Sequence, residues 1–200
     1  MKSITLSIVA VVVLGGLVYF YTRSATSEPA KPINLVLTIE NVPGMLRGVT
    51  MHIPVDNTSV DVLIDSYAAH DTSVLGGTTE DAKSTVTVFI PEFNDTFTQG
   101  AWGVVDGASV YVPTYINFGG TGQFFMVALF TYDANTKTLT HQDLHFVNDR
   151  IAFDGMVQSG EKMAAIHYRT HAEGEAMTDE PTLAATRTLR INEDRLELIE

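Results

Sequence analysis

Short β-branched segments that recur at intervals of about ten residues constrain the fold of this 200-residue chain more than any other feature. Gly, Pro, Asn or Asp residues bound most of them, as turns do between strands. Beyond residue 23 no stretch has sustained helical periodicity, and the best candidate for a short helix is Thr79–Lys83. The pattern predicts an all-β domain, mainly an antiparallel sandwich or a partly closed barrel. The predicted strands are residues 33–40, 49–54, 60–66, 85–90, 109–116, 123–132, 138–146, 151–157, 163–170, 186–192 and 196–199.

Two segments of this pattern predict more than a strand. Gln123–Tyr132 is apolar enough for a central strand that is covered on both faces. Asp133–Lys137 is typical of a hairpin loop into the next strand.

Gly119–Gly122 lacks the Lys–Ser/Thr tail and the helix of a phosphate-binding loop, so we predict a tight turn there. We expect Trp102 in the apolar core rather than in a ligand cleft.

An apolar segment, Ile4–Tyr21, precedes the β pattern, and only Thr5 and Ser7 interrupt it. As a helix it would cover roughly 27 Å, which is close to the thickness of the hydrocarbon layer of a bilayer. We therefore predict one N-terminal transmembrane helix before the all-β domain. The predicted organisation is a signal anchor over 1–23, a linker over 24–32 and an extracytoplasmic β-rich domain over 33–200.

The alternative for the apolar segment is a cleaved signal peptide. The apolar segment is longer than the usual apolar core of such peptides. Arg23 also lies where small residues should precede a cleavage site. Ser24–Thr26 is a poor match to such a site. A short N-terminal tail before a large acidic domain favours the N-terminus inside. These features predict a single-pass protein of the cell membrane whose C-terminal domain is outside the cytoplasm.

Charge and cysteine content exclude several partners and chemistries. Of the 12 basic residues, Lys2 and Arg23 flank the apolar segment, and the other 10 follow it with all 24 acidic residues. The exported part therefore carries a formal charge of −14, which disfavours binding to nucleic acid. The chain has no cysteine, which excludes disulfides, zinc–thiolate sites and thiol catalysis. The predicted partners are the membrane, through residues 4–21, and an envelope protein or glycan.

Histidine spacing offers the best case for a metal site. His141 and His145, and likewise His167 and His171, have the H-x-x-x-H spacing. On a strand this spacing separates the two side chains by roughly 13 Å, whereas zinc ligands lie about 2 Å from the metal. A shared site would need different segments, for example His145 with His167. We predict neither a metal site nor a cofactor.

No motif in the chain identifies a catalytic residue. There is no Gly-x-Ser-x-Gly turn for a nucleophilic serine and no alternating acidic run for calcium. The acidic pairs Glu173/Glu175 and Asp179/Glu180 lie in loop-like sequence, which is typical of a solvated loop. Catalytic residues are therefore left unassigned.

Five segments of the C-terminal half follow one another: Gly119–Ala128, Asn148–Ile151, His167–Met177, Pro181-Thr182 and Thr186–Leu189. Together they resemble a family of small exported bacterial envelope proteins of unassigned function, which carry GGSGTFYY-like, GDR-I, PGEPM-like and TR-T motifs. The resemblance covers roughly residues 100–199. It implies export and a β-rich fold and names no reaction.

The resemblance implies structural roles rather than chemistry for the matching residues. Gly119, Gly120 and Gly122 match turn glycines, and Asp149 and Arg150 match a turn. An acidic, calcium-like run that many relatives carry is reduced here to Asp106-Gly107.

The loop that matches the PGEPM-like segment supports a structural hypothesis of its own. Glu175 would be held by Arg150 or Arg169, because a bidentate Arg–carboxylate pair is geometrically specific. Met177 would fill the edge of the core.

Two functions remain open at this point. The first is a non-catalytic envelope module that binds a protein, a glycan or another surface component. The second is a hydrolase or metal-dependent enzyme of the envelope. An enzyme should bring at least three of its ionisable groups together in one concave pocket, whereas a binding module should leave them scattered. The groups in question are His145, His167, His171, Glu173 and Glu175.

We expect the apolar segment to remain attached in the mature protein, because Ile4–Tyr21 is long and the sequence around Arg23 is a poor cleavage site. The intact mass of protein extracted from membranes should equal that of the whole chain. An N-terminus near Thr26 or Ser27 would contradict this prediction.

Overall fold

The computed structural model describes residues 37–66, 75–81, 84–91 and 97–199. This part of the chain is all-β, and every pair of strands in it is antiparallel, which confirms the predicted class. One short helix, α2 (Val42–Leu46), precedes the strands. None of the helices in the described ranges is long and apolar enough to cross a membrane. The transmembrane helix predicted over residues 4–21 lies outside those ranges.

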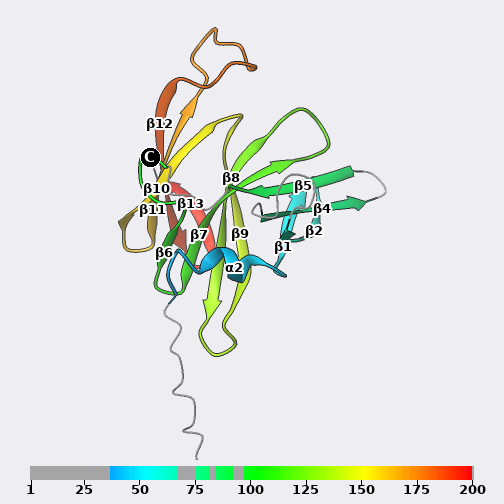
Figure 1. Ribbon diagram of the computed structural model, residues 1–200, viewed down its shortest axis with the longest axis vertical. Coiled ribbons are helices and arrows are strands. Elements are labelled where there is room, and N and C mark those ends of the chain that lie inside the picture. Colours follow the sequence, from blue (N-terminus) through cyan, green and yellow to red (C-terminus); the bar gives the residue numbers. More distant parts are fainter. Residues whose placement is uncertain (1–36, 67–74, 82–83, 92–96, 200) are drawn as a thin grey trace, which may run out of the picture. The chain divides into compact units, whose positions relative to one another are not determined.

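The strands form three sheets (Figure 1). The largest has seven strands, and β8 lies between β7 and β9 within it. A two-stranded hairpin and a four-stranded sheet complete the fold. The large sheet contains β3 (Asp65–Ser66), β4 (Leu75–Asp81), β5 (Ser84–Ile90), β6 (Val104–Asp106), β7 (Ser109–Asn117), β8 (Phe124–Asp133) and β9 (Thr138–Asp149). The hairpin contains β1 (Thr50–Val55) and β2 (Thr58–Leu63), and the four-stranded sheet contains β10 (Ala152–Gly160), β11 (Met163–Thr170), β12 (Leu183–Asn192) and β13 (Arg195–Ile199).

Strand β8 contributes to two hydrophobic cores, one on each face of the large sheet. Its even-numbered side chains from Ala128 to Tyr132 belong to a first core, which the hairpin, α2, β4 and β5 complete. Its odd-numbered side chains from Phe125 to Leu129 belong to a second core, which β10 to β13 complete. Successive side chains of a strand point to opposite faces, so an uninterrupted apolar run is what a doubly covered strand needs. The prediction of a central strand is confirmed.

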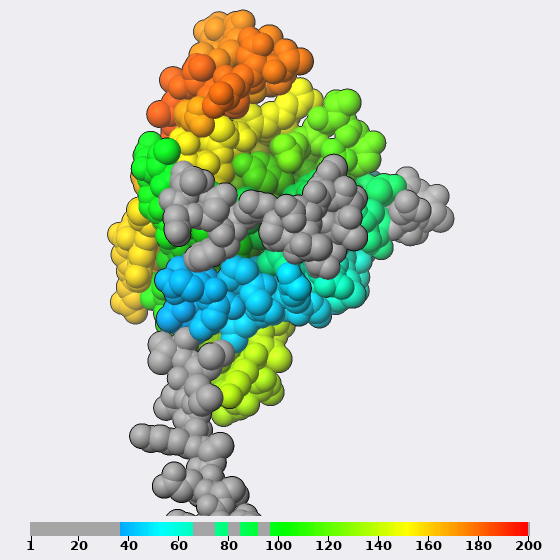
Figure 2. Space-filling view, in the orientation of Figure 1, coloured from blue at the N-terminus to red at the C-terminus, as the bar shows by residue number. Residues whose placement is uncertain are grey.

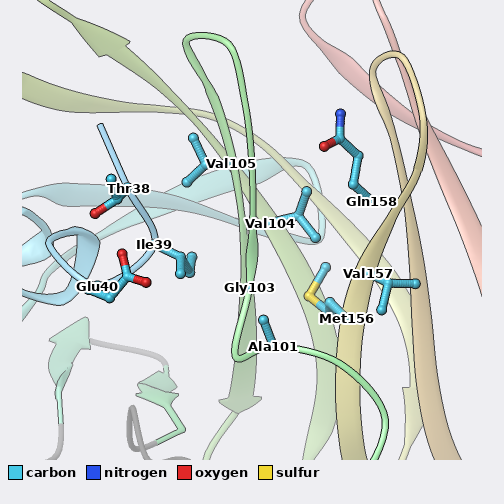
Figure 3. Close-up of a pocket in the computed structure, with 10 residues that line it drawn as sticks. All are labelled: Thr38, Ile39, Glu40, Ala101, Gly103, Val104, Val105, Met156, Val157 and Gln158. Atoms are coloured by element: carbon cyan, nitrogen blue, oxygen red, sulfur yellow. The ribbon is translucent and has the colours of Figure 1, made fainter. Parts of the chain in front are cut away.

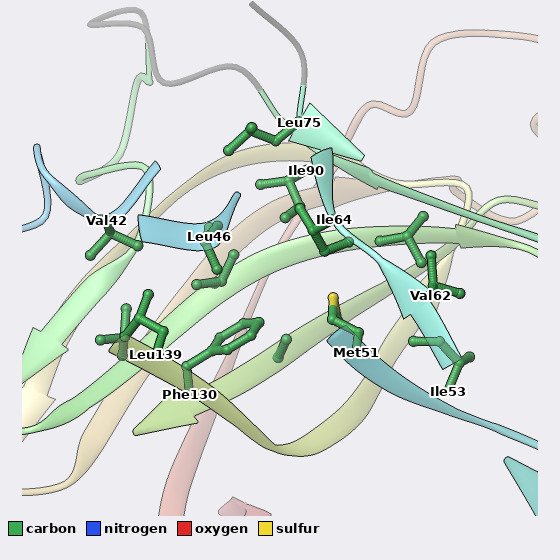
Figure 4. Close-up of a cluster of buried hydrophobic side chains, with 14 of the residues drawn as sticks. Val42, Leu46, Met51, Ile53, Val62, Ile64, Leu75, Ile90, Phe130 and Leu139 are labelled. Carbon is green, nitrogen blue, oxygen red and sulfur yellow. The ribbon is translucent and has the colours of Figure 1, made fainter. Parts of the chain in front are cut away.

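The first core joins the hairpin and the helix to the large sheet (Figure 4). Phe130 of β8 is fully buried, as are Leu46 of α2 and Met51 of β1. Complete burial of side chains of this size stabilises a fold by about 1.5–3 kcal/mol each. Trp102 is also buried, with an exposed fraction of 2%. Its indole Nε1 donates a hydrogen bond to the Pro91 carbonyl at 2.6 Å. Its predicted place in the core is confirmed.

Two predicted turns have the expected geometry. In the β8–β9 hairpin, the Asp133 carboxylate accepts a hydrogen bond from the amide of Asn135 at 2.7 Å, and Lys137 has a φ of 58°. Between β7 and β8, the Asn117 side chain accepts from the Gly119 amide at 2.7 Å and donates to the Gly122 carbonyl at 2.8 Å. Short polar side chains that bond to nearby backbone groups are the usual means of fixing such turns.

One predicted strand is wrong, the weak helix candidate at Thr79 is a strand, and two strands were missed. Residues 37–40 are not a strand, because the chain turns at Ile39–Asn41 and the Asn41 side chain accepts a hydrogen bond from the Thr38 amide. Thr79 lies in strand β4 rather than in a short helix. Strands β4 and β6 were not predicted. β4 is rich in Gly and Thr, and β6 has three residues, so pairing with neighbouring strands defines them more than local propensity does.

Gly155→Ala should destabilise the domain, whereas Gly120→Ala should not. Gly155 has a φ of 141°, and an added Cβ would lie 2.4 Å from the backbone oxygen of Gln99. Gly120 has no atom within 4 Å of that position. We expect a loss of about 2–4 kcal/mol for Gly155→Ala, or a melting temperature lower by roughly 5–15 °C. Equal thermal melts for the two variants would contradict this account.

Candidate functional site

A groove of about 480 Å³ lies where the segment before α2 meets β6 and β10 (Figure 3). Most of its lining is apolar, and its polar side chains are Thr38, Glu40 and Gln158. Figure 3 shows Val104 on the side of β6 that faces Met156, so these two side chains fill the space between the strands. The apolar lining consists of Ile39, Ala101, Gly103, Val104, Val105, Met156 and Val157.

Backbone contacts hold the groove in one shape. Ala101 and Met156 exchange two backbone hydrogen bonds of 2.8 Å, which join the segment before β6 to β10. The Lys162 amide donates to the Asp106 carboxylate at 2.5 Å and thereby ties the β10–β11 turn to the end of β6. A Cβ at Gly103 would lie 2.6 Å from the backbone carbonyl oxygen of Tyr111, so the chain needs glycine there. The groove is therefore largely preformed, as binding pockets usually are.

The lining of the groove supplies affinity for apolar groups but little chemistry. Glu40 is the one ionisable side chain among the lining residues that the structure describes. A hydrogen bond from the Thr38 side chain lowers the pKa of Glu40, which favours the charged carboxylate. The described part of the lining includes no histidine, cysteine, lysine or serine that could act as a nucleophile or form an acid–base pair with Glu40.

A second region of interest surrounds a bulge in strand β9. His141 pairs with Phe130 and Asp143 with Leu129, so Gln142 is an extra residue without a partner on β8. A regular strand would send His141 and Asp143 to the same face, and the extra residue sends them to opposite faces. His141 Nδ1 accepts a hydrogen bond from the His52 amide of β1, at 3.3 Å. Asp143 Oδ2 accepts one from the Leu196 amide of β13, at 2.7 Å.

His141 is neutral at neutral pH because it is buried. Its exposed fraction is 8%, and burial, followed by the nearby His52, lowers its pKa from 6.5 to about 4. Since Nδ1 accepts a hydrogen bond, the proton of the neutral ring is on Nε2, which has no hydrogen-bond partner among the described residues. On the hairpin, His52 Nδ1 lies 2.6 Å from the Asp61 carboxylate, and both side chains are more than half exposed.

The bulge does not assemble a catalytic or metal centre from the described residues. Two hollows, of about 220 and 600 Å³, flank β9 and share Gln142, Asp143 and Leu144. The His52–Asp61 pair resembles the orienting half of an acid–base system, but no hydroxyl of the described residues is hydrogen-bonded to the His52 ring. Within the described ranges no three His, Asp or Glu side chains could hold a metal ion.

The five groups that an envelope enzyme would use do not converge. His145 lies on β9 of the large sheet and His167 on β11 of the four-stranded sheet, so the suggested pairing of their strands is wrong. His167 is bonded to the Thr186 hydroxyl instead, at 3.0 Å. His171 and Glu175 lie 3.7 Å apart in the loop after β11, where Glu173 is exposed.

The hypothesis for that loop is also wrong. Glu175 accepts a hydrogen bond from the Ala172 amide at 2.8 Å rather than from an arginine. Arg169 bonds to Asp154 and Glu180, at 3.3 and 2.7 Å. Asp154 is buried and needs a cation, which explains why Arg169 turns toward it. Met177, expected at the edge of the core, is 55% exposed.

A turn sequence in the β1–β2 hairpin indicates the pairing of His52 with Asp61 beside the bulge. Asp56-Asn57 is a two-residue turn sequence, and Asp56 has a φ of 52°. A two-residue hairpin loop at this position makes Val55 pair with Thr58 and therefore His52 with Asp61. Nothing in the sequence indicated the groove, because its lining comes from three distant segments.

Fold and site together define an all-β domain with one preformed apolar groove and no assembled catalytic centre among its described residues. Comparisons of the chain with models of protein families, with curated proteins and with solved structures found no match. The resemblance to exported bacterial envelope proteins stays a prediction.

Acid should destabilise the protein through His141. Between pH 6.5 and about 4 the unfolded chain binds a proton at this residue that the folded chain does not bind. The free energy of unfolding is therefore highest, as far as His141 is concerned, above pH 6.5. It falls by about 3 kcal/mol as the pH decreases toward 4. Urea unfolding at a series of pH values measures this slope. His141→Phe should flatten it, and an unchanged slope would assign the titration to another group.

Proposed function

We propose that this chain is a non-catalytic binding module, anchored in the cell membrane through residues 4–21 and exposed outside the cytoplasm. Its groove would bind an apolar side chain of an envelope protein. The observation that carries this proposal is a preformed groove whose lining is mostly aliphatic. Apolar pockets with a few polar groups at the rim are typical of binding sites.

The lining of the groove favours a protein over a glycan as the partner. Sugars are bound through stacking on aromatic rings and through many polar groups. Among the described residues that line it, none is aromatic and the polar side chains are Thr38, Glu40 and Gln158. Aliphatic residues such as Val105 and Val157 instead suit Leu, Ile or Met side chains, whose burial is worth about 1.5–3 kcal/mol each.

The alternative function, an envelope hydrolase or metal-dependent enzyme, has less support. It needs several of its five candidate groups in one pocket. His145 lines a hollow beside β13, whereas His167 lies on β11 and bonds to Thr186. In the loop after β11, Glu175 accepts a hydrogen bond from the Ala172 amide, Glu173 is exposed, and His171 lies 3.7 Å from Glu175, so two of the five groups are close together and a third is not.

A methyl NMR titration of the full chain in lipid nanodiscs tests the binding of apolar groups. The probe is the capped tripeptide acetyl-Leu-Val-Leu-amide, and the comparison ligand is N,N′-diacetylchitobiose. We expect saturable shifts at Ile39, Val104 and Val157 with the peptide and none with the sugar. Val157→Glu should weaken binding at least tenfold, because it introduces a charge that would be desolvated.

Leu63→Glu is the matched control for that variant. Leu63 is 56% exposed on β2 and does not line the groove, so this substitution should leave the peptide titration unchanged. Shifts that appear with the sugar, or equal affinities for both variants, would contradict the proposed function.

A further inference from the structure

The loop between β11 and β12, residues 171–182, covers two ionisable side chains while an apolar side chain beside them is exposed. The side chains of His171 and Glu175 are turned inward and are only 8% and 14% exposed. Met177 is 55% exposed, and Leu183, at the start of β12, is 53% exposed. A solvated loop normally does the opposite, because burying ionisable groups and exposing apolar groups both cost free energy.

Hydrogen bonds from the loop itself compensate for the inward turn of Glu175. The Ala172 amide donates to its carboxylate at 2.8 Å. This bond is the main reason why the pKa of Glu175 lies below its usual value, and bonds from the side chain and amide of Thr182 and the nearby His171 act in the same direction. The charged carboxylate therefore fixes the two ends of the loop to each other.

Arg169 holds the far side of the loop. Its guanidinium donates to the Glu180 carboxylate at 2.7 Å and to the Pro181 carbonyl at 3.4 Å. The same guanidinium bonds to Asp154, which anchors it in the body of the domain. Both ends of the loop are thus held in place, although most of its residues face solvent.

Held in this way, the loop stands out from the rest of the domain. Figure 2 shows it in orange at the top of the molecule, projecting beyond the neighbouring strands. Exposed apolar side chains are ordinary when they are scattered on a surface, but these two lie at one end of one hairpin, β11–β12. Holding a loop rigid before binding reduces the entropy that binding must overcome.

We propose that this loop is a second interaction surface, distinct from the groove, which inserts Met177 into an apolar pocket of a partner protein. Leu183 packs against the wall of that pocket. The proposal rests on the side-chain arrangement of residues 171–182 and is independent of the function proposed for the groove.

The charges around Met177 define the chemistry of the partner. Glu173 and Asp179 are exposed on the loop, Glu180 is paired with Arg169, and no exposed basic side chain lies between residues 171 and 182. The complementary partner is an apolar pocket whose rim carries Lys or Arg. Such an arrangement steers association and makes it depend on salt, whereas the apolar contact supplies most of the affinity.

Photocrosslinking of the full chain in its own membranes tests the proposal. A benzophenone side chain is placed at Met177 or Leu183, and at Leu198 as a control. Leu198 is 43% exposed on β13 of the same sheet. We expect the same partner to be crosslinked from the two loop positions and not from Leu198, with a yield that falls as salt is raised. The purified partner should then bind Met177→Ala at least tenfold more weakly than the unmodified chain and Leu198→Ala equally well.

The outcomes are separable from effects on folding. Met177 is exposed, so Met177→Ala should leave the thermal melt unchanged. Glu175→Gln should weaken partner binding without removing any exposed apolar surface, because it loosens the loop. Equal crosslinking from Leu198, a crosslinked dimer of the chain itself, or unchanged affinity of Met177→Ala for the purified partner would each overturn the proposal. None of these results depends on whether the groove binds the apolar tripeptide.

Discussion

The burial of β8 on both faces is the constraint on which the rest of the structure depends. Phe130 and Leu129 are neighbours in the chain, yet they belong to different cores because a strand alternates its side chains. Neither core could form without a layer on its own side of the large sheet. The hairpin with α2 covers one face, and the four-stranded sheet covers the other. The positions of the groove and of the β9 bulge follow from this layering, since both lie where layers meet.

The sequence predicted the fold better than the site for a physical reason. Strands such as β8 and β11 have local signals, namely β-branched and aromatic residues between turn formers, and these were sufficient to place them. Leu37–Glu40 has the same composition, but the side chain of Asn41 closes a turn there. Strand β4 has a weak local signal and exists because β5 pairs with it. Pairing across the chain is not visible in a window of ten residues.

The candidate sites were missed because they depend on register. The groove combines residues 38–40, 101–105 and 156–158, which come together only after the sheets are assembled. The loop after β11 was recognised, but its contacts were assigned to the wrong partners. Asp154 is buried and therefore takes Arg169, which leaves Glu175 to the backbone amide of Ala172. The burial of the Asp154 carboxylate thus determines which hydrogen-bond donor is left for Glu175.

The single extra residue at Gln142 has a consequence for how the protein behaves among its neighbours. An exposed strand edge offers unpaired amides to any other chain, which is the usual start of aggregation. Here His141 occupies an amide of β1 and Asp143 occupies an amide of β13, on opposite faces of the same sheet. One inserted residue therefore allows β9 to occupy one backbone amide on each of two other strands. These two contacts therefore disfavour edge-to-edge pairing of separate molecules at β1 and β13.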